Sequence, residues 1–182
     1  MACLLGESPM DFKHGDKVVY PNQGVGVIEQ ISYGMLNGRT VKYYTLRILS
    51  TGSRVMVPQT NVEAVGLRPL IRPAETSKVL SFLEKGRCTN HHDWKHRYKE
   101  NSERMRTGSL MDVAAVLKSL LALSRTKPLS FREKKMLERA KQLLVSEMAV
   151  AKGTTETAIE SSLMRALAKA RLQLPTGTES PE

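Results

Sequence analysis

The stretch YGMLNGRTVKYYTLRIL, residues 33–49, decides the fold of the N-terminal part of this 182-residue chain. Asn37 and Gly38 lie between two runs that are rich in aromatic and other apolar residues. A type I′ turn needs a positive φ at both central residues, and Asn-Gly tolerates this best. The stretch therefore predicts a β-hairpin with a two-residue loop. The faces of its second strand would carry Lys42, Tyr44, Leu46 and Ile48 on one side, and Val41, Tyr43, Thr45 and Arg47 on the other.

Further short strands flank this hairpin. They are predicted over residues 18–20, 26–32, 54–57 and 62–65. Pro58 ends the third of these, and because proline has no amide hydrogen to donate, it marks that strand as an edge of the sheet. Several short strands without an intervening helix are typical of a small, strongly bent sheet or an SH3/Tudor-like barrel.

The composition changes at residues 68–73, where two prolines bracket a connector and helix-forming residues then become frequent. Five helices are predicted: over residues 76–85, over 93–107 with Asp93 as N-cap, from Ser109 to the break at Lys127-Pro128, from Ser130 to Gly153, and from Thr154 or Thr155 to Ala170. Ser130 and Glu133 have the spacing of a capping box, in which each side chain accepts a hydrogen bond from the other residue's backbone N–H.

The predicted fold class is therefore α+β with two domains. A small N-terminal Tudor/SH3-like β-barrel precedes a compact all-α domain of about five helices. The predicted boundaries are a flexible extension at 1–11, the β domain at 12–68, a linker at 69–75, the helical domain at 76–173 and a disordered tail at 174–182.

The charge of the chain is concentrated in one block. Residues 74–152 hold 17 basic and 9 acidic residues, and this excess of eight is most of the net charge of +10. A localised excess of this kind favours a polyanionic partner such as DNA or RNA, although an inert basic surface has the same composition. No apolar run has the length of a membrane span, so no membrane partner is expected. Two cysteines give no disulfide framework, which fits a reducing cytoplasm.

Catalytic and metal-binding motifs are weak. Cys88, His91, His92 and His96 lie within nine residues, but no second cysteine or carboxylate stands at zinc-site spacing. The Gly24-Val25-Gly26 segment lacks the Lys-Ser/Thr and the following helix of a phosphate loop. We therefore expect no enzyme activity, no metal and no cofactor.

Trp94 is the one tryptophan of the chain, and basic residues surround it. Lys95, Arg97 and Lys99 are suited to neutralise phosphates, and an exposed aromatic ring can stack on a base or wedge into a base step. The alternative is a salt-bridged helix with Trp94 and Tyr98 packed inward. Because the strand over residues 54–57 is a predicted edge, a partner protein could add a strand there. The residues thus indicate one module for a protein and one for DNA.

The chain resembles the CarD/CdnL group of bacterial transcription regulators. The resemblance runs in order through both predicted domains, and its motifs are FKHGDKVVYP at 12–21 with GVG at 24–26, YTLRIL at 44–49, RVMVP at 54–58, WKHRYK at 94–99 and LSFREKKML at 129–137. It implies that the β domain is a Tudor-like RNA-polymerase-interacting module. Such a module docks on the lobe of the polymerase β subunit through its edge strand, here Arg54, Val55, Met56, Val57 and Pro58. Some members have Arg at the position of Met56, so docking here would be more apolar.

The resemblance further implies that the helical domain binds promoter DNA, mainly through its backbone and minor groove. In this family the tryptophan wedges into the minor groove at the upstream edge of the transcription bubble, so that open complexes live longer. The DNA-binding residues it implies here are Trp94, Lys95, His96, Arg97, Lys99, Lys134 and Lys135; some members have Arg in place of His96. We expect a monomeric, nucleoid-associated regulator. The alternative is a general nucleoid or nucleic-acid-binding protein without polymerase contact.

Overall fold

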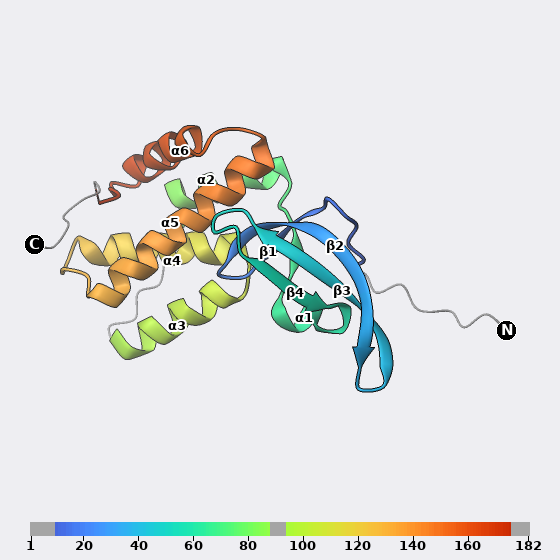
Figure 1. The fold of residues 1–182 in the computed structure, drawn as a ribbon. Helices are drawn as coiled ribbons and strands as arrows, with labels where there is room; N and C mark the ends of the chain where they lie inside the picture. The colour runs from blue at the N-terminus through green and yellow to red at the C-terminus, as the bar shows by residue number, and fades with distance from the viewer. Residues whose placement is uncertain (1–9, 88–93, 176–182) are drawn as a thin grey trace, which may run out of the picture. The chain divides into compact units, whose positions relative to one another are not determined.

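The computed structural model describes residues 10–87 and 94–175, except for the side chain of Trp94. They form two compact units, one that ends at Leu70 and one that begins at Ile71, and each is described by itself (Figure 1). Asp93, the predicted N-cap, lies outside the described residues, as do residues 1–9 and 176–182, which hold most of the predicted extension and tail.

The N-terminal unit is built on one antiparallel sheet in the order β4-β3-β2-β1-β5. The strands are β1 (Lys17–Tyr20), β2 (Gly24–Leu36), β3 (Arg39–Ile48), β4 (Arg54–Pro58) and β5 (Arg68–Pro69). β2 and β3 form the predicted hairpin. At its turn, Asn37 and Gly38 have φ angles of 51° and 76°. Both are positive, as a type I′ turn requires, so the hairpin prediction is confirmed.

The core of this unit lies on one face of the sheet. Tyr44, Leu46 and Ile48, which the alternation along β3 predicted to share a face, are all buried. The Phe12 ring packs edge-on against Tyr44, with 5.7 Å between the ring centroids. Phe12, Tyr44 and Leu46 belong to one cluster of buried apolar side chains. Its other buried members are Val18, Ile28, Val57, Val62 and Leu67.

Two features of the sheet unit correct the prediction. Residues 62–65, predicted as a strand, form the short helix α1 (Val62–Val65). Val62 and Val65 are three residues apart, so one helical turn directs both toward the core. After Gly66, β5 pairs with β1. The sheet therefore ends at β4 and β5, and in the described residues it is open and does not close into a barrel.

The second unit is all-α, as predicted. The helices in its described part are α2 (Pro73–Lys85), α3 (Trp94–Arg106), α4 (Leu110–Ser124), α5 (Phe131–Lys152) and α6 (Glu156–Lys169). Ser109, Ser130 and Thr155 cap the last three by accepting the backbone N–H three residues on. α2 begins at Pro73, earlier than predicted, because proline needs no hydrogen-bond partner at the first helical position. The connector is therefore shorter than the predicted 69–75.

α4 is buried on most sides, because it contacts α2, α3 and α5. The long helix α5 lies between α4 and α6 and contacts both (Figure 1). The predicted apolar stripes of α4, α5 and α6 form the core, with Leu117, Leu144 and Leu163 fully buried. No helix in the described part of the chain is both long enough and apolar enough to span a membrane.

Candidate functional site

β4 is an edge strand. It pairs with β3 from Tyr43 opposite Pro58 to Arg47 opposite Arg54, and it stands at one end of the strand order. The prediction from Pro58 that this strand lies at the edge of the sheet is confirmed. An edge strand offers backbone N–H and C=O groups to a further strand, which is how many proteins recognise an extended partner segment.

The side chains of β4 alternate between the two faces of the sheet. Arg54 and Met56 are exposed, Met56 to 62%, and Pro58 is half-buried. Val57 is buried in the sheet core and Val55 packs against that core. Of the five residues expected to meet a partner, Val57 therefore holds the strand on the sheet and does not present its side chain, whereas Arg54, Met56 and Pro58 do.

Glu29 on β2 balances the charge beside this edge. Its two carboxylate oxygens accept hydrogen bonds from Nε of Arg54 at 2.9 Å and from Nε of Arg47 at 2.5 Å. These hydrogen bonds, that from Arg54 first, hold the pKa of Glu29 below its ordinary value. With Arg54 paired, the exposed surface of β4 is dominated by Met56.

A second exposed apolar group, not predicted from the sequence, lies near the tip of the β2–β3 hairpin. Tyr33 and Met35 are 70% and 69% exposed. β4 pairs with β3 only over residues 43–47, so the tip extends past the other strands (Figure 1). The alternation Ile31-Tyr33-Met35 continues the apolar face of β2 beyond the core. This alternation in the sequence could have predicted the exposed apolar group.

α3 presents exposed basic residues near its N-terminal end. Lys95, His96 and Lys99 are exposed, as expected of side chains that bind phosphate. Tyr98 is half-buried. Trp94 begins the helix, and its side chain lies outside the described residues. Lys99 stands 4.0 Å from Glu103 one turn later, an exposed pair of little energetic weight.

Arg97 differs from these neighbours, because its side chain is only 4% exposed. Its Nη2 donates a hydrogen bond to Oε1 of Glu133 at 3.2 Å. In this position the guanidinium faces the interior of the helical unit and is not on the surface that a phosphate can reach. This burial does not favour the expected DNA-backbone contact by Arg97, which stays a prediction.

Glu133 uses its two carboxylate oxygens for different partners. Oε2 accepts hydrogen bonds from the Ser130 amide at 2.9 Å and the Ser130 hydroxyl at 2.8 Å, which confirms the predicted capping box of α5. Oε1 accepts the bond from Arg97. Burial raises the pKa of Glu133, but the hydrogen bonds from Ser130 and Arg97 outweigh burial and leave that pKa below its ordinary value. One carboxylate thus joins the start of α5 to α3.

The first turn of α5 adds cations and an exposed aromatic ring. Lys134 and Lys135 are both exposed, as expected for phosphate contacts. Phe131 is 70% exposed, and Nζ of Lys135 lies 4.6 Å from its ring centroid, a cation–π distance. Phe131 was not predicted as a surface residue. Its position directly after the N-cap, in a helical turn whose other residues are charged, could have predicted its exposure.

The cysteine–histidine cluster gains no support. Cys88, His91 and His92 lie outside the described residues, and His96 is exposed on α3. Among the side chains that the structure describes, no three of the His, Cys, Asp and Glu type are arranged to hold a metal ion.

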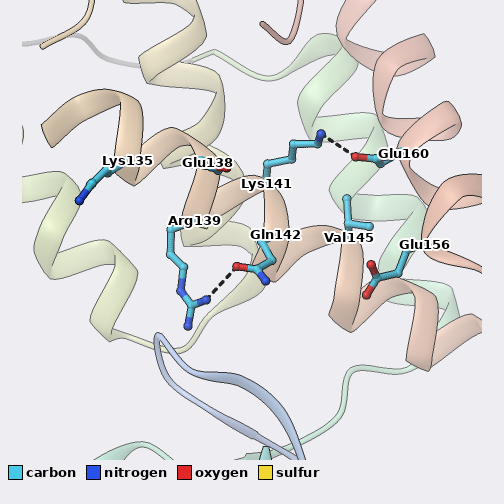
Figure 2. Close-up of a pocket in the computed structure, with 8 residues that line it drawn as sticks. All are labelled: Lys135, Glu138, Arg139, Lys141, Gln142, Val145, Glu156 and Glu160. Carbon is cyan, nitrogen blue, oxygen red and sulfur yellow. Dashed lines mark hydrogen bonds and ion pairs between the residues drawn. The ribbon is translucent and has the colours of Figure 1, made fainter. Parts of the chain in front are cut away.

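A shallow hollow lies between α5 and α6 (Figure 2). Lys141 forms an ion pair with Glu160 across it, and Arg139 donates a hydrogen bond to Gln142. Val145 is its single apolar lining residue. Small-molecule pockets are lined mainly by apolar and aromatic side chains, so this lining does not indicate a ligand site.

Comparison with known proteins matches each unit separately. The model of the CarD-like/TRCF RID domain matches residues 12–71, and that of the CarD C-terminal domain matches residues 78–164. Two solved structures from Myxococcus xanthus are similar to part of the chain. The N-terminal domain of CarD is 38% identical and covers 35% of this chain and 85% of its own, with a TM-score of 0.30. The CdnL N-terminal domain is 45% identical and covers 36% and 93%, with a TM-score of 0.29.

A full-length relative spans both units. The candidate transcription factor YdeB of Bacillus subtilis (strain 168) is 33% identical over 150 residues, which is 82% of this chain and 98% of YdeB. The sheet unit carries the RID match and the helical unit carries the C-terminal match, in the order that the family has them. The chain therefore belongs to the CarD/CdnL family of transcription factors.

Proposed function

We propose that this chain binds the lobe of the RNA polymerase β subunit and promoter DNA at the same time, and that it stabilises the open complex at the upstream edge of the bubble. The observation that carries this proposal is the pair of family matches, one on each structural unit. The sheet unit supplies an edge for a protein, and the helical unit supplies exposed cations for DNA. No catalytic step is part of this function.

Docking on the polymerase is assigned to β4. A strand of the β subunit adds to the free edge, and the backbone hydrogen bonds provide affinity. Met56, with Pro58 on the same face, contributes the apolar contact. Arg54 is paired with Glu29, so it contributes less charge to the interface than an unpaired arginine.

DNA binding is assigned to the exposed basic residues of α3 and of the start of α5. These are Lys95, His96, Lys99, Lys134 and Lys135. Their contacts to phosphates release counterions and do not depend on sequence. Trp94 acts as the wedge: an apolar side chain in the minor groove unstacks a base step, and there it opposes the closing of the bubble. Because docking on polymerase raises the effective concentration of the helical unit near the promoter, weak DNA affinity is sufficient.

Binding of the full chain to the isolated β subunit tests the docking half. Met56→Asp places a charge on the apolar edge without disturbing the sheet core, and we expect binding at least about tenfold weaker. Met164→Asp is the matched control, since Met164 is a 51% exposed methionine on α6. It should bind like the native chain. Equal binding by the native and Met56→Asp chains would rule out docking through this edge.

The second candidate function is a general nucleoid or nucleic-acid-binding protein that does not contact polymerase. It is favoured by the excess of eight positive charges in residues 74–152. The β-subunit experiment separates the two functions. A native chain that binds DNA but not the β subunit has the second function and not the first.

A further inference from the structure

We propose that the buried Arg97–Glu133 pair is a strut that sets the position of α3 against the start of α5. Arg97 then controls DNA affinity as a positioning residue, without touching DNA. The proposal rests on the proposed DNA-binding function of the helical unit.

α3 has few apolar anchors. Its buried side chains, among those described, are Arg97, Asn101 and Met105, which are four residues apart and therefore lie on one face. Met105, near the C-terminal end of the helix, belongs to the apolar core. Near the N-terminal end the same face carries a guanidinium. Among the described side chains at that end, the guanidinium is the buried one, so its partner helps to hold the end in place.

Glu133 is a fixed partner for this guanidinium. Its carboxylate is held by both the amide and the hydroxyl of Ser130. It cannot turn away from α3 without also uncapping α5, a helix of 22 residues. Arg97 is thus fastened to the end of a long helix and not to a flexible surface side chain.

In the sequence, the two residues of the strut lie within the two groups of basic residues assigned to DNA. Lys95, His96 and Lys99 flank Arg97 on α3, and Lys134 and Lys135 follow Glu133 on α5. Cations that are already held at the spacing of their phosphates lose less conformational freedom on binding. If α3 moves away from α5, the two groups no longer bind the same stretch of backbone together.

The strut and a simple surface-charge account predict opposite effects for Glu133→Gln. If only charge matters, removing an acidic group beside the basic surface strengthens DNA binding. If the strut matters, the same change removes the charge of Glu133 that holds the buried Arg97 at the start of α5, α3 is released, and binding weakens.

The experiment measures the affinity of the full chain for a fluorescein-labelled fork-junction duplex by fluorescence anisotropy at several salt concentrations. Circular dichroism establishes a temperature at which the variants are folded. We expect Glu133→Gln and Arg97→Met each to bind about tenfold more weakly. The double variant Arg97→Met/Glu133→Gln should regain most of the affinity, because a buried ion pair can be replaced by an uncharged pair.

The salt dependence separates positioning from contact. If Arg97 bound a phosphate, its loss would lower the slope of log affinity against log salt by about 0.9 in the double variant. The strut predicts that the double variant keeps the native slope. The emission of Trp94, the one tryptophan in the sequence, provides a further signature: without DNA it should change in Glu133→Gln and return toward native in the double variant.

Glu75→Gln is the matched control. Glu75 also caps a helix of the same unit, by accepting the Arg72 amide at 2.9 Å, but it is exposed. We expect native or slightly tighter DNA binding from this variant. If Glu133→Gln also binds as tightly as native or tighter, while Lys134→Ala binds more weakly, the strut is overturned and the DNA-binding function stands. If the native chain does not bind the duplex, or Lys134→Ala has no effect, the proposed function itself fails and the strut's role in DNA binding fails with it.

Discussion

Glu133 in the helical unit and Glu29 in the sheet unit are chemically alike. Each carboxylate accepts hydrogen bonds from two residues, each binds an arginine of another element, and each has a pKa held below its ordinary value. They differ in burial: Arg97 and Glu133 have side chains 4% and 10% exposed, whereas Arg54 is 70% exposed.

This difference in burial assigns the two carboxylates different roles. Arg54 is largely exposed, so water can solvate it in place of Glu29. That pair therefore adds little to stability and mainly reduces the net charge beside β4. Arg97 is almost fully buried, so water cannot take the place of Glu133, and a charge that loses its ion-pair partner inside a protein is costly. The buried pair therefore decides where a helix sits.

The largest effect should come from breaking the buried pair. Arg97→Met leaves the Glu133 carboxylate without its cationic partner, and we expect the free energy of unfolding of the helical unit to fall by about 3 to 5 kcal/mol. Urea denaturation followed by helical circular dichroism measures it. Arg54→Met, the exposed counterpart, should leave the unfolding midpoint within error. A loss of less than about 1 kcal/mol for Arg97→Met would place that pair in the same class as surface pairs.

An intermediate effect is expected at the cap. Ser130→Ala removes the N-cap of α5 and also the hydroxyl that donates to the Glu133 carboxylate, while the amide of residue 130 still donates to it, so we expect a loss of about 1 to 2 kcal/mol in unfolding free energy. Thr155→Ala removes the N-cap of α6, where Oγ1 accepts the Ala158 amide at 3.3 Å and no interhelical pair is attached. Its loss should be smaller. Equal losses in parallel denaturation experiments would show that the cap and the Arg97 pair act independently.

Acid should weaken the helical unit partly through Glu133. Because its pKa is lower in the folded state than the ordinary 4.5, the unfolded state binds more protons in acid. The stabilisation is fully present above that ordinary value and is lost as pH falls through the folded pKa. Denaturation midpoints measured down to about pH 3 should fall less steeply in Glu133→Gln than in the native chain. An unchanged slope would mean that other carboxylates account for the acid sensitivity.

The smallest effect is expected at Glu29. Glu29→Gln keeps an acceptor for Arg47 and Arg54, and water screens both arginines, so the unfolding midpoint should not change measurably. The same denaturation series provides the comparison. A midpoint that falls as far as in Glu133→Gln would contradict the distinction between the two carboxylates.

Features that depend on local chemistry were predictable from the sequence. Asn37-Gly38 specifies its turn by backbone conformation, Pro58 marks an edge by its missing donor, and Ser130 with Glu133 forms a capping box by spacing. Each rule involves residues that are close in sequence, and the structure confirms all three.

Features that depend on tertiary partners were not predictable. Residues 62–65 have the composition of a strand, yet packing against the sheet core makes them a helical turn. Arg97 lies in a basic run, and nothing local shows that Glu133, 36 residues later, will bury it. The spacing of Arg97, Asn101 and Met105 does indicate a common face. Because two of the three are polar, that face has no apolar stripe that would identify it as the inner one.

The bridging function is tested most directly by the lifetime of the open promoter complex with the native chain and with Trp94→Ala. The lifetimes are compared at protein concentrations that give equal occupancy of the polymerase–promoter complex. The proposal predicts a long lifetime with the native chain and a lifetime close to that of polymerase alone with Trp94→Ala. An unchanged lifetime at equal occupancy would contradict the wedge.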